Sequence, residues 1–350
     1  MSPATLRRRG TAAFGVLALA TLAACSSDAD ASSGTGTDSA AASSAPADDA
    51  GTEYPVTVQN CGEDLEIPAE PESVLSIGTS AVALLDAAGA SERIVARAGE
   101  FGADLPPDLA TPPTDAPVLD PFDPTIEVIV GAEADIIVGY GLFNAAVEDV
   151  EAAGLTNVVI DGECSHDAAL TRKTDFDAIF ADVERLGTIF DTQAEAAENV
   201  TALRAELDEL TAAAGAQPDG EAAAGESAAV VYYFSEDATM SARGGQGIAD
   251  DVLARAGLEN TYGDEQSVYL EANVETLLDA DPDVLVLAYG LYGESYEDAL
   301  ATFMDEPGAA DLAAVQQDRI IGVPAADLAP DPGAVRGLEA VLEGTGALEE

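Results

Sequence analysis

The sequence predicts an α/β protein of two similar lobes, each with a mostly parallel sheet flanked by helices, joined by one long rigid helix. First, the chain writes one unit twice, as TIEVIVGAEADIIVGY over Thr125–Tyr140 and as NVETLLDADPDVLVLAY over Asn273–Tyr289. In both copies an Asp follows a Glu by eight residues, and an apolar run then ends near a Tyr. Second, short apolar runs alternate with helical patterns on both sides of the centre, which is typical of parallel sheets. Third, a central stretch carries no strand pattern.

The first lobe is expected over residues 54–173. Its apolar runs are short and continuous, as in strands that are buried on both faces, and they predict strands at 73–78, 93–97, 134–140 and 157–161. The patterns between them predict a helix from Thr79 or Ser80, as the cap, to Asp86, a short helix from Asp123-Pro124, and a helix through Val147 that ends at Gly154.

The central segment, residues 174–214, is predicted to be helical throughout. We expect Gly187 to divide it into two pieces, of which the second runs from Thr192 to about residue 214. Apolar residues follow helical spacing along that second piece, at Ala196, Val200, Leu203, Leu207 and Leu210. A helix of this length covers roughly 30 Å at 1.5 Å per residue. It would link the lobes stiffly, so we expect them to move little and to hold a shallow, largely preformed cleft.

The second lobe, residues 215–350, restarts the alternation. We expect a strand at 228–234, a helix at 247–256, a helix from Asn273 followed by a strand at 283–289, a strand at 319–324 and a closing helix from about Pro332.

The amino-terminal residues predict export. Arg7, Arg8 and Arg9 precede an apolar stretch, residues 12–24, that falls short of the roughly 20 apolar residues a membrane helix needs. We interpret residues 1–24 as a signal peptide. It ends in Leu22-Ala23-Ala24-Cys25, which resembles a bacterial lipobox, so Cys25 is expected to carry the lipid. An ordinary signal whose small residues happen to precede a Cys is the alternative. Residues 25–53 hold little to bury and predict a disordered tether.

Two cysteines remain after Cys25, namely Cys61 and Cys164. An even pair in an exported chain predicts a disulfide, although two buried free thiols would leave the same pattern.

The formal charge of −53 excludes most nucleic-acid binding, because such binding depends on Lys and Arg meeting phosphates. The chain has one histidine, His166, and no GxSxG nucleophile turn, so we expect neither catalytic residues nor an enzyme.

The order of these segments resembles the substrate-binding proteins of ABC transporters for iron complexes. The resemblance covers the chain from about Val56 to its end and is carried by VTVQNCG, PESVLSIG, ALLDAAGASERIVA, IEVIVGAEADIIVG, AGLENTYGD, VETLLDADPDVLVLA and DRIIGVP. Ser73 stands where that family usually has an Arg, and we interpret this as a surface change.

The resemblance implies capture of an iron chelate and its delivery to an ABC permease. A ferric siderophore is the ligand we favour, and haem and cobalamin are the alternatives. It further implies a monomer without a cofactor, held by its lipid anchor on the outer face of the cytoplasmic membrane. Because a metal site would need several imidazole or carboxylate ligands, the single histidine favours iron that arrives already chelated, and no metal site is expected. A secreted α/β enzyme and a surface lipoprotein without a transport role remain as other classes.

Loops that follow the carboxyl ends of strands should form the cleft. Their aromatic rings suit flat apolar ligands and their arginines suit anionic oxygens, so we expect ligand contacts from Arg97, Tyr140, Phe143, Tyr233, Arg243, Tyr289 and Tyr292. Arg243 leads because its setting, SARGGQG, is rich in glycine. Each Tyr could instead pack at a strand end, and each Arg could form a surface ion pair.

Glu127 and Glu275 occupy equivalent places in the repeated unit. Each is expected in or near the first turn of a short helix, where a carboxylate offsets the helix dipole. The resemblance implies a further role for them, as one docking residue per lobe for arginines of the permease.

Overall fold

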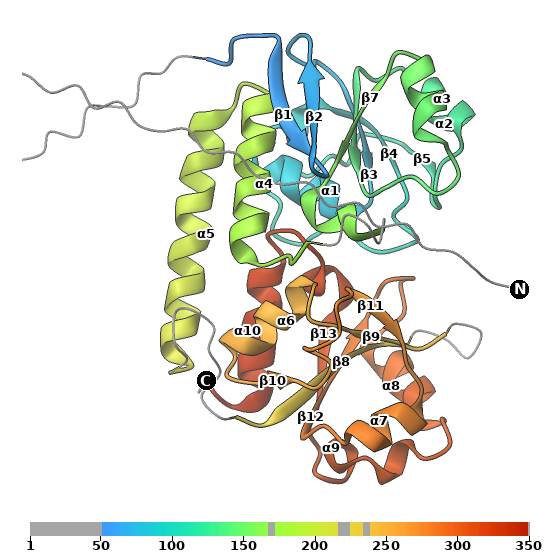
Figure 1. Ribbon diagram of the computed structural model, residues 1–350, viewed down its shortest axis with the longest axis vertical. Helices are drawn as coiled ribbons and strands as arrows, with labels where there is room; N and C mark the ends of the chain where they lie inside the picture. The colour runs from blue at the N-terminus through green and yellow to red at the C-terminus, as the bar shows by residue number, and fades with distance from the viewer. Residues whose placement is uncertain (1–50, 167–171, 216–224, 234–238, 349–350) are drawn as a thin grey trace, which may run out of the picture. The chain divides into compact units, whose positions relative to one another are not determined.

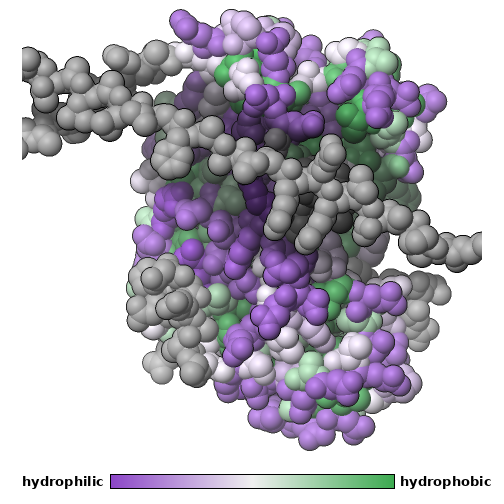
Figure 2. Space-filling model, viewed as in Figure 1, coloured by the Kyte–Doolittle hydropathy of each residue, from purple (hydrophilic) through white to green (hydrophobic). Residues whose placement is uncertain are grey.

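The computed structural model describes residues 51–166, 172–215, 225–233 and 239–348. The predicted signal peptide, Cys25 and most of the predicted tether lie outside these ranges. Residues 49–350 form one compact unit. Within the described ranges, no helix has both the length and the apolar character needed to cross a membrane. Hydrophilic residues cover most of the face drawn in Figure 2, as the high acidic content predicts.

The first lobe is built on a sheet of five parallel strands in the order β5-β4-β3-β6-β7. The strands are β3 (Val74–Ile77), β4 (Ile94–Ala98), β5 (Val118–Asp120), β6 (Ile136–Gly139) and β7 (Thr156–Val159). The two central strands, β3 and β6, are buried at every residue, which explains their unbroken apolar sequences. The helices are α1 (Thr79–Ala87), α2 (Ile126–Gly131) and α3 (Val147–Ala152).

The expected cap of α1 by Thr79 or Ser80 is wrong. The N-cap is Gly78, with φ of 88° and no capping bond from a side chain. A Cβ at Gly78 would lie 3.1 Å from the ring of Tyr140. The chain therefore needs glycine here both for the left-handed backbone and for the close approach of that ring.

A two-stranded antiparallel hairpin of β1 (Val56–Asn60) and β2 (Glu63–Ile67) precedes the sheet. Its turn is Cys61-Gly62, with φ of 52° and 86°.

The central segment forms two helices, α4 (Phe176–Ile189) and α5 (Gln193–Ala213). The prediction that Gly187 divides them is wrong, because Gly187 lies inside α4 and the break comes at Asp191, which has φ of 58°. A Cβ on Gly187 would lie 2.6 Å from the Cβ of Ala196, so this glycine lets the two helices pack closely. The long helix α5 contacts its neighbour α4, α1 of the first lobe and α10 of the second (Figure 1).

The second lobe has a sheet in the order β11-β9-β8-β12-β13, with β10 paired to β8. The pairs of β12 with β8 and β13 are parallel, whereas β9 pairs antiparallel with both of its neighbours, β8 and β11. The strands are β8 (Ser227–Tyr232), β9 (Ser241–Arg243), β10 (Glu259–Asn260), β11 (Tyr269–Glu271), β12 (Val284–Tyr289) and β13 (Ile320–Pro324). The helices are α6 (Ile248–Arg255), α7 (Val274–Ala280), α8 (Tyr296–Met304), α9 (Ala313–Gln316) and α10 (Ala334–Thr345). The predicted fold class, two α/β lobes with mostly parallel sheets and a long linking helix, is confirmed.

The repeated unit forms the same structure in both lobes, a short helix followed by a central strand: α2 with β6, and α7 with β12. A reciprocal set of hydrogen bonds fixes the start of each strand. In the first lobe Asp135 Oδ2 accepts from the N–H and hydroxyl of Ser73, and Ser73 Oγ accepts from the N–H of Asp135. In the second lobe Asp283 and Ser227 repeat all three bonds. Ser73 is therefore a bonded partner of Asp135 and more than a surface change.

Candidate functional site

A cavity of about 390 Å³ lies between the lobes. Its walls come from segments that follow β3, β4 and β6 in the first lobe and β9, β12 and β13 in the second. The amino-terminal ends of α1 and α6 also reach it, through Gly78, Thr79, Gly247 and Ile248. This placement at the carboxyl ends of strands is the usual ligand position in open α/β sheets.

Arg243 is the cation among the described lining residues. Its side chain is only 9% exposed, and its guanidinium carbon lies 3.6 Å from the ring centre of Tyr232 and 4.0 Å from that of Tyr269. Within the part of the chain that the structure describes, the buried guanidinium Nη1 has no hydrogen-bond partner. Since an unmet buried donor is costly, this nitrogen is prepared to meet an anionic oxygen in the cavity.

Tyr140 lines the opposite wall. Close to the carboxylate of Asp123, Tyr140 buries its Oη. A Cβ on Gly99 would lie 2.2 Å from that oxygen, so a glycine of positive φ, 67°, admits the side chain. Burial raises the pKa of Tyr140, and the carboxylate of Asp123 raises it further. The phenol is therefore kept protonated and can donate a hydrogen bond.

Two more predicted aromatic residues lie at the rim. Phe143 is 61% exposed and Tyr292 is 54% exposed, and both line the cavity. Sequence reasoning missed Phe101, which also lines it and contacts Phe122, Tyr140 and Tyr292 at ring-centre distances of 5.9, 6.5 and 6.1 Å. Its place in GEFG, directly after a strand, was an available signal.

Three predicted ligand residues are not among those that line the cavity. Arg97 is paired with Glu100 at 2.8 Å and donates from Nε to the carbonyl of Ala116. Tyr233 is buried with its hydroxyl on Glu306, and Tyr289 packs against Tyr296 at 5.7 Å. These positions match the alternatives of ion pairing and strand-end packing.

Sequence reasoning chose the wrong member of the Tyr232-Tyr233 pair for the cavity. Successive side chains of a strand point to opposite faces, so only one of the two can reach the cavity, and that one is Tyr232. Tyr269, Glu100 and Glu163 were also missed. The carboxylate of Glu163 raises the pKa of Tyr269, against the lowering effect of Arg243. Burial raises the pKa of Glu100, against the effect of Arg97.

A family model described as periplasmic binding protein matches residues 74–326, which is more than two thirds of the chain. The chain belongs to the periplasmic binding protein family. No functionally curated protein matched the sequence in a direct comparison. The family match confirms a substrate-binding component of a transport system and not an enzyme, and it places this periplasmic binding protein outside the cytoplasm.

Solved structures support the same assignment. An ABC-type Fe3+-hydroxamate transport protein from Saccharomonospora viridis is 28% identical with a TM-score of 0.71, and the match covers 84% of this chain and all of that one. The haem-binding protein of Roseiflexus sp. and the vitamin B12-binding protein of Vibrio cholerae are each 19% identical with TM-scores of 0.59. Those matches cover 79% and 81% of this chain, and 98% and 100% of the others. At that identity they show the fold alone. Together with the family match, the likeness to the Fe3+-hydroxamate transport protein at 28% identity confirms that this chain is a binding protein of the iron-complex type.

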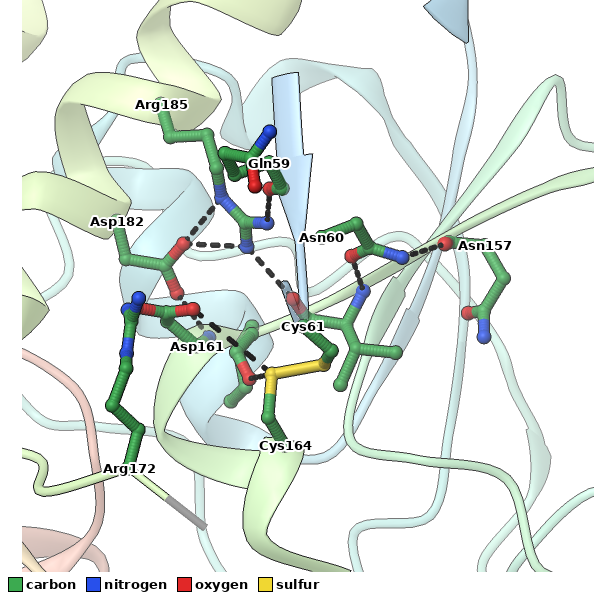
Figure 3. The surroundings of a disulfide bond; sticks show 11 residues. Gln59, Asn60, Cys61, Asn157, Asp161, Cys164, Arg172, Asp182 and Arg185 are labelled. Atoms are coloured by element: carbon green, nitrogen blue, oxygen red, sulfur yellow. Dashed lines mark hydrogen bonds and ion pairs between the residues drawn. A yellow bond between two sulfur atoms is a disulfide. The ribbon is translucent and has the colours of Figure 1, made fainter. Parts of the chain in front are cut away.

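The disulfide expected between Cys61 and Cys164 is present in this periplasmic binding protein (Figure 3). It joins the turn of the β1-β2 hairpin to the 3-10 turn Asp161–His166, which also brings Gly162 and Glu163 to the cavity. The same wall is held from α4. Asp182 Oδ2 accepts from the N–H of Asp161, and Arg185 donates to Asp182 and to the carbonyl of Val159. Burial raises the pKa of Asp182, against the effect of Arg185.

Glu127 and Glu275 lie in the first turns of α2 and α7, as expected, and both are exposed. Hydrogen bonds from the backbone N–H of Glu127 and from the hydroxyl of Thr125 hold the pKa of Glu127 below its usual value. In the second lobe the helix has an additional capping box between Asn273 and Thr276. The two carboxylates are therefore equivalently placed on their lobes.

Proposed function

We propose that this protein captures a ferric siderophore outside the cell membrane and delivers it to the permease of an ABC transporter. The observation that carries this proposal is Arg243, a buried arginine in the cavity whose Nη1 has no hydrogen-bond partner among the described residues. Many ferric chelates are anionic, and a guanidinium held between two Tyr rings would pair with their oxygens in a fixed geometry.

Two observations favour a siderophore over haem or cobalamin. The solved structure with 28% identity bears the description Fe3+-hydroxamate transport, whereas the haem and vitamin B12 binders share 19%. In addition, the raised pKa of Tyr140 keeps its phenol as a donor, which suits the oxygen-rich surface of a hydroxamate complex. An axial ligand to haem iron would have to be the phenolate.

A binding titration tests the proposal. Ferric desferrioxamine, a ferric catecholate, a ferric carboxylate chelate, haemin and cyanocobalamin are each added while Tyr emission and melting temperature are followed. Arg243→Ala should weaken an anionic ferric siderophore by roughly 1.5–3 kcal/mol, the range for hydrogen bonds to charged groups. Arg319→Ala, which removes a surface ion pair with Glu226, is the matched control and should bind normally. Binding of haemin or cyanocobalamin alone would overturn the siderophore assignment.

We further propose that Cys25 is lipidated after removal of residues 1–24 and that residues 25–53 tether the lobes to the membrane. The first lobe would then span residues 54–173, the link 174–214 and the second lobe 215–350. One acyl chain binds membranes only marginally, so more than one is expected. Mass spectrometry of the mature amino terminus should find Cys25 acylated. An unmodified terminus at another residue would contradict the anchor.

Glu127 and Glu275 are proposed to dock this protein on the permease. One acidic residue on each lobe would let the permease hold both lobes at once and gain avidity from two modest contacts. Glu127→Ala with Glu275→Ala should abolish uptake of the radiolabelled chelate and leave its affinity unchanged, while each single variant keeps part of the uptake.

Glu148→Ala with Glu297→Ala is the matched control, because both residues are exposed acids in first helical turns. Its uptake should be normal. Normal transport in the Glu127 and Glu275 double variant would defeat the docking role, and lost ligand affinity would place these residues in the cleft instead.

A further inference from the structure

Two loops with the same pattern of glycine and aromatic residues follow strands of different lobes. Gly99-Glu100-Phe101-Gly102 follows β4, and Gly290-Leu291-Tyr292-Gly293 follows β12. Both read glycine, any residue, aromatic residue, glycine. All four glycines have positive φ, at 67°, 90°, 87° and 83° in chain order. This backbone conformation is open to glycine and strained for other residues, so the form of both loops is set by their glycines.

The two loops meet across the cavity. The rings of Phe101 and Tyr292 lie 6.1 Å apart between centres at an interplanar angle of 89°, which is an edge-to-face contact. Beside them, a Cβ on Gly293 would lie 3.1 Å from the carbonyl oxygen of Gly102. The glycines therefore let the backbones come close enough for the rings to touch.

Hydrogen bonds within its own lobe fix the backbone of each loop. Glu294 accepts from the N–H groups of Gly290 and Tyr292, at 2.6 and 2.9 Å, with one carboxylate oxygen for each. On the first lobe, Phe101 has φ of 54°, an uncommon value for a residue with a side chain. Its N–H donates to the carbonyl of Pro121 at 2.7 Å. Both aromatic residues are thus aimed at one another by contacts within their own lobes.

We propose that Phe101 and Tyr292 form an aromatic gate at the rim of the cavity, with Glu294 as the positioning residue that holds the Tyr292 side. The rings belong to different lobes and both line the cavity, so their contact covers part of its mouth. A bulky solute passes that part only when the rings separate. An edge-to-face pair adds a modest stabilisation, which corresponds to about two- to tenfold in the rate of opening.

Thiol labelling tests the gate without any ligand. Ala326 lines the cavity and is half-buried, so Ala326→Cys in the full chain places a thiol behind the gate. The rate at which a bulky maleimide labels this thiol is followed by mass spectrometry, which also separates it from other cysteines. Phe101→Ala and Tyr292→Ala should each raise the rate about two- to tenfold, and the double variant should label no faster than the faster single one. An unchanged rate, or fully multiplicative effects, would overturn the gate.

Phe122→Ala is the matched control. Phe122 also contacts the ring of Phe101, but it does not line the cavity, so its removal should leave the labelling rate unchanged. An equal acceleration there would show general loosening instead of a gate. Glu294→Ala should accelerate labelling in the natural background and have no effect once Tyr292 is Ala, whereas any loss of melting temperature should be the same in both backgrounds.

A second measurement rests on the proposed function. In stopped-flow binding of ferric desferrioxamine, loss of either ring should raise the association rate as well as the dissociation rate, because a gate changes the barrier both to entry and to exit. A rise in the dissociation rate alone would make the rings ordinary ligand contacts and overturn the gate. If no chelate binds, the proposed function fails, and the labelling result still decides the gate.

Discussion

The carboxyl ends of the two copies of the repeated unit have nearly the same sequence, but their side chains are placed differently. The first copy continues as Tyr140-Gly141-Leu142-Phe143 and the second as Tyr289-Gly290-Leu291-Tyr292. The last aromatic residue of each, Phe143 and Tyr292, reaches the cavity, whereas of the two leading tyrosines only Tyr140 does. Tyr140 follows Asp135 by five residues and Tyr289 follows Asp283 by six. Tyr289 is still the last residue of β12, paired with Pro324, whereas Tyr140 lies one residue beyond the end of β6, so the alternation of the strand does not fix its ring.

The lobes also differ in what holds them next to the cavity. The first lobe uses the Cys61–Cys164 disulfide together with the buried Asp182. The second uses an acid and arginine cluster with no covalent bond: Arg336 pairs with Asp327, and Asp331 is buried nearby with its carboxylate on the N–H of Gly333. The disulfide can be reduced and does not titrate, so the first lobe should respond to reducing conditions, whereas Asp182 and Asp331 are buried carboxylates through which both lobes can respond to pH.

The largest expected change in stability comes from removing the disulfide of the first lobe. Cys61→Ala with Cys164→Ala removes a bond between residues 103 positions apart. Loss of so long a closed loop should lower the free energy of unfolding by up to about 4–5 kcal/mol in the chain-entropy model. Urea unfolding of the variant and of the reduced natural protein measures it, and the two losses should agree. A loss below about 1 kcal/mol would mean that the first lobe does not depend on its covalent bond.

The second largest change in stability is expected at Asp331, the buried carboxylate of the second lobe. Burial raises the pKa of Asp331 to about 7, against hydrogen bonds from Ser80 and Gly333 that lower it. A carboxyl whose folded pKa lies above its unfolded value, about 3.9, stabilises the fold below that unfolded value and loses the contribution as pH rises through 7. Asp331→Asn cannot ionise, so its stability relative to the natural protein should rise between pH 4 and pH 8, by up to about 4 kcal/mol.

Thermal unfolding at several pH values measures the difference. Glu339→Gln, at an exposed residue of α10, is the control for the loss of one carboxylate charge. A flat difference for Asp331→Asn would mean that burial does not raise the pKa of Asp331 above its unfolded value.

A smaller effect compares the bonded Ser and Asp pairs. Ser73→Ala and Ser227→Ala each remove a hydroxyl that donates to an Asp and accepts an N–H. The free energy of unfolding should fall by about 1 kcal/mol, the usual contribution of a hydrogen bond. The loss should be larger at Ser227, because Asp283 is half-buried whereas Asp135 is exposed. Equal losses in urea unfolding would show that burial does not distinguish the two copies.

The smallest effect concerns the leading tyrosines. Tyr140→Phe removes a donor that faces the cavity, so ferric desferrioxamine should bind a few-fold more weakly, as expected for one neutral hydrogen bond. Tyr289→Phe should bind normally, because Tyr289 packs against Tyr296 away from the cavity. Fluorescence titration of both variants decides this, and an equal loss in the two would remove the difference between the copies.

The sequence by itself determined the elements that follow from local pattern. Continuous apolar runs identified β3, β6, β8 and β12, because strands buried on both faces need no polar alternation. The repeated Glu and Asp spacing identified two equivalent lobes, and helical spacing identified α5. The disulfide was predictable because parity left one pair of cysteines in an exported chain. Arg243 was predictable because it is a rare cation in a glycine-rich loop.

Only the tertiary structure decided which of the candidate side chains meet in the cavity. Tyr232 and Tyr233 are adjacent in sequence and differ in the sheet face they take, whereas Tyr140 lies just beyond the end of its strand and Tyr289 is still within its own. Gly187 looked like a helix end, yet its missing Cβ serves the contact with Ala196 on the neighbouring helix. Phe101 and Tyr292 are far apart in the chain, and each belongs to a loop whose glycines give no sign of the partner. Such contacts arise between elements, so physical chemistry fixes them only once the lobes are folded and packed.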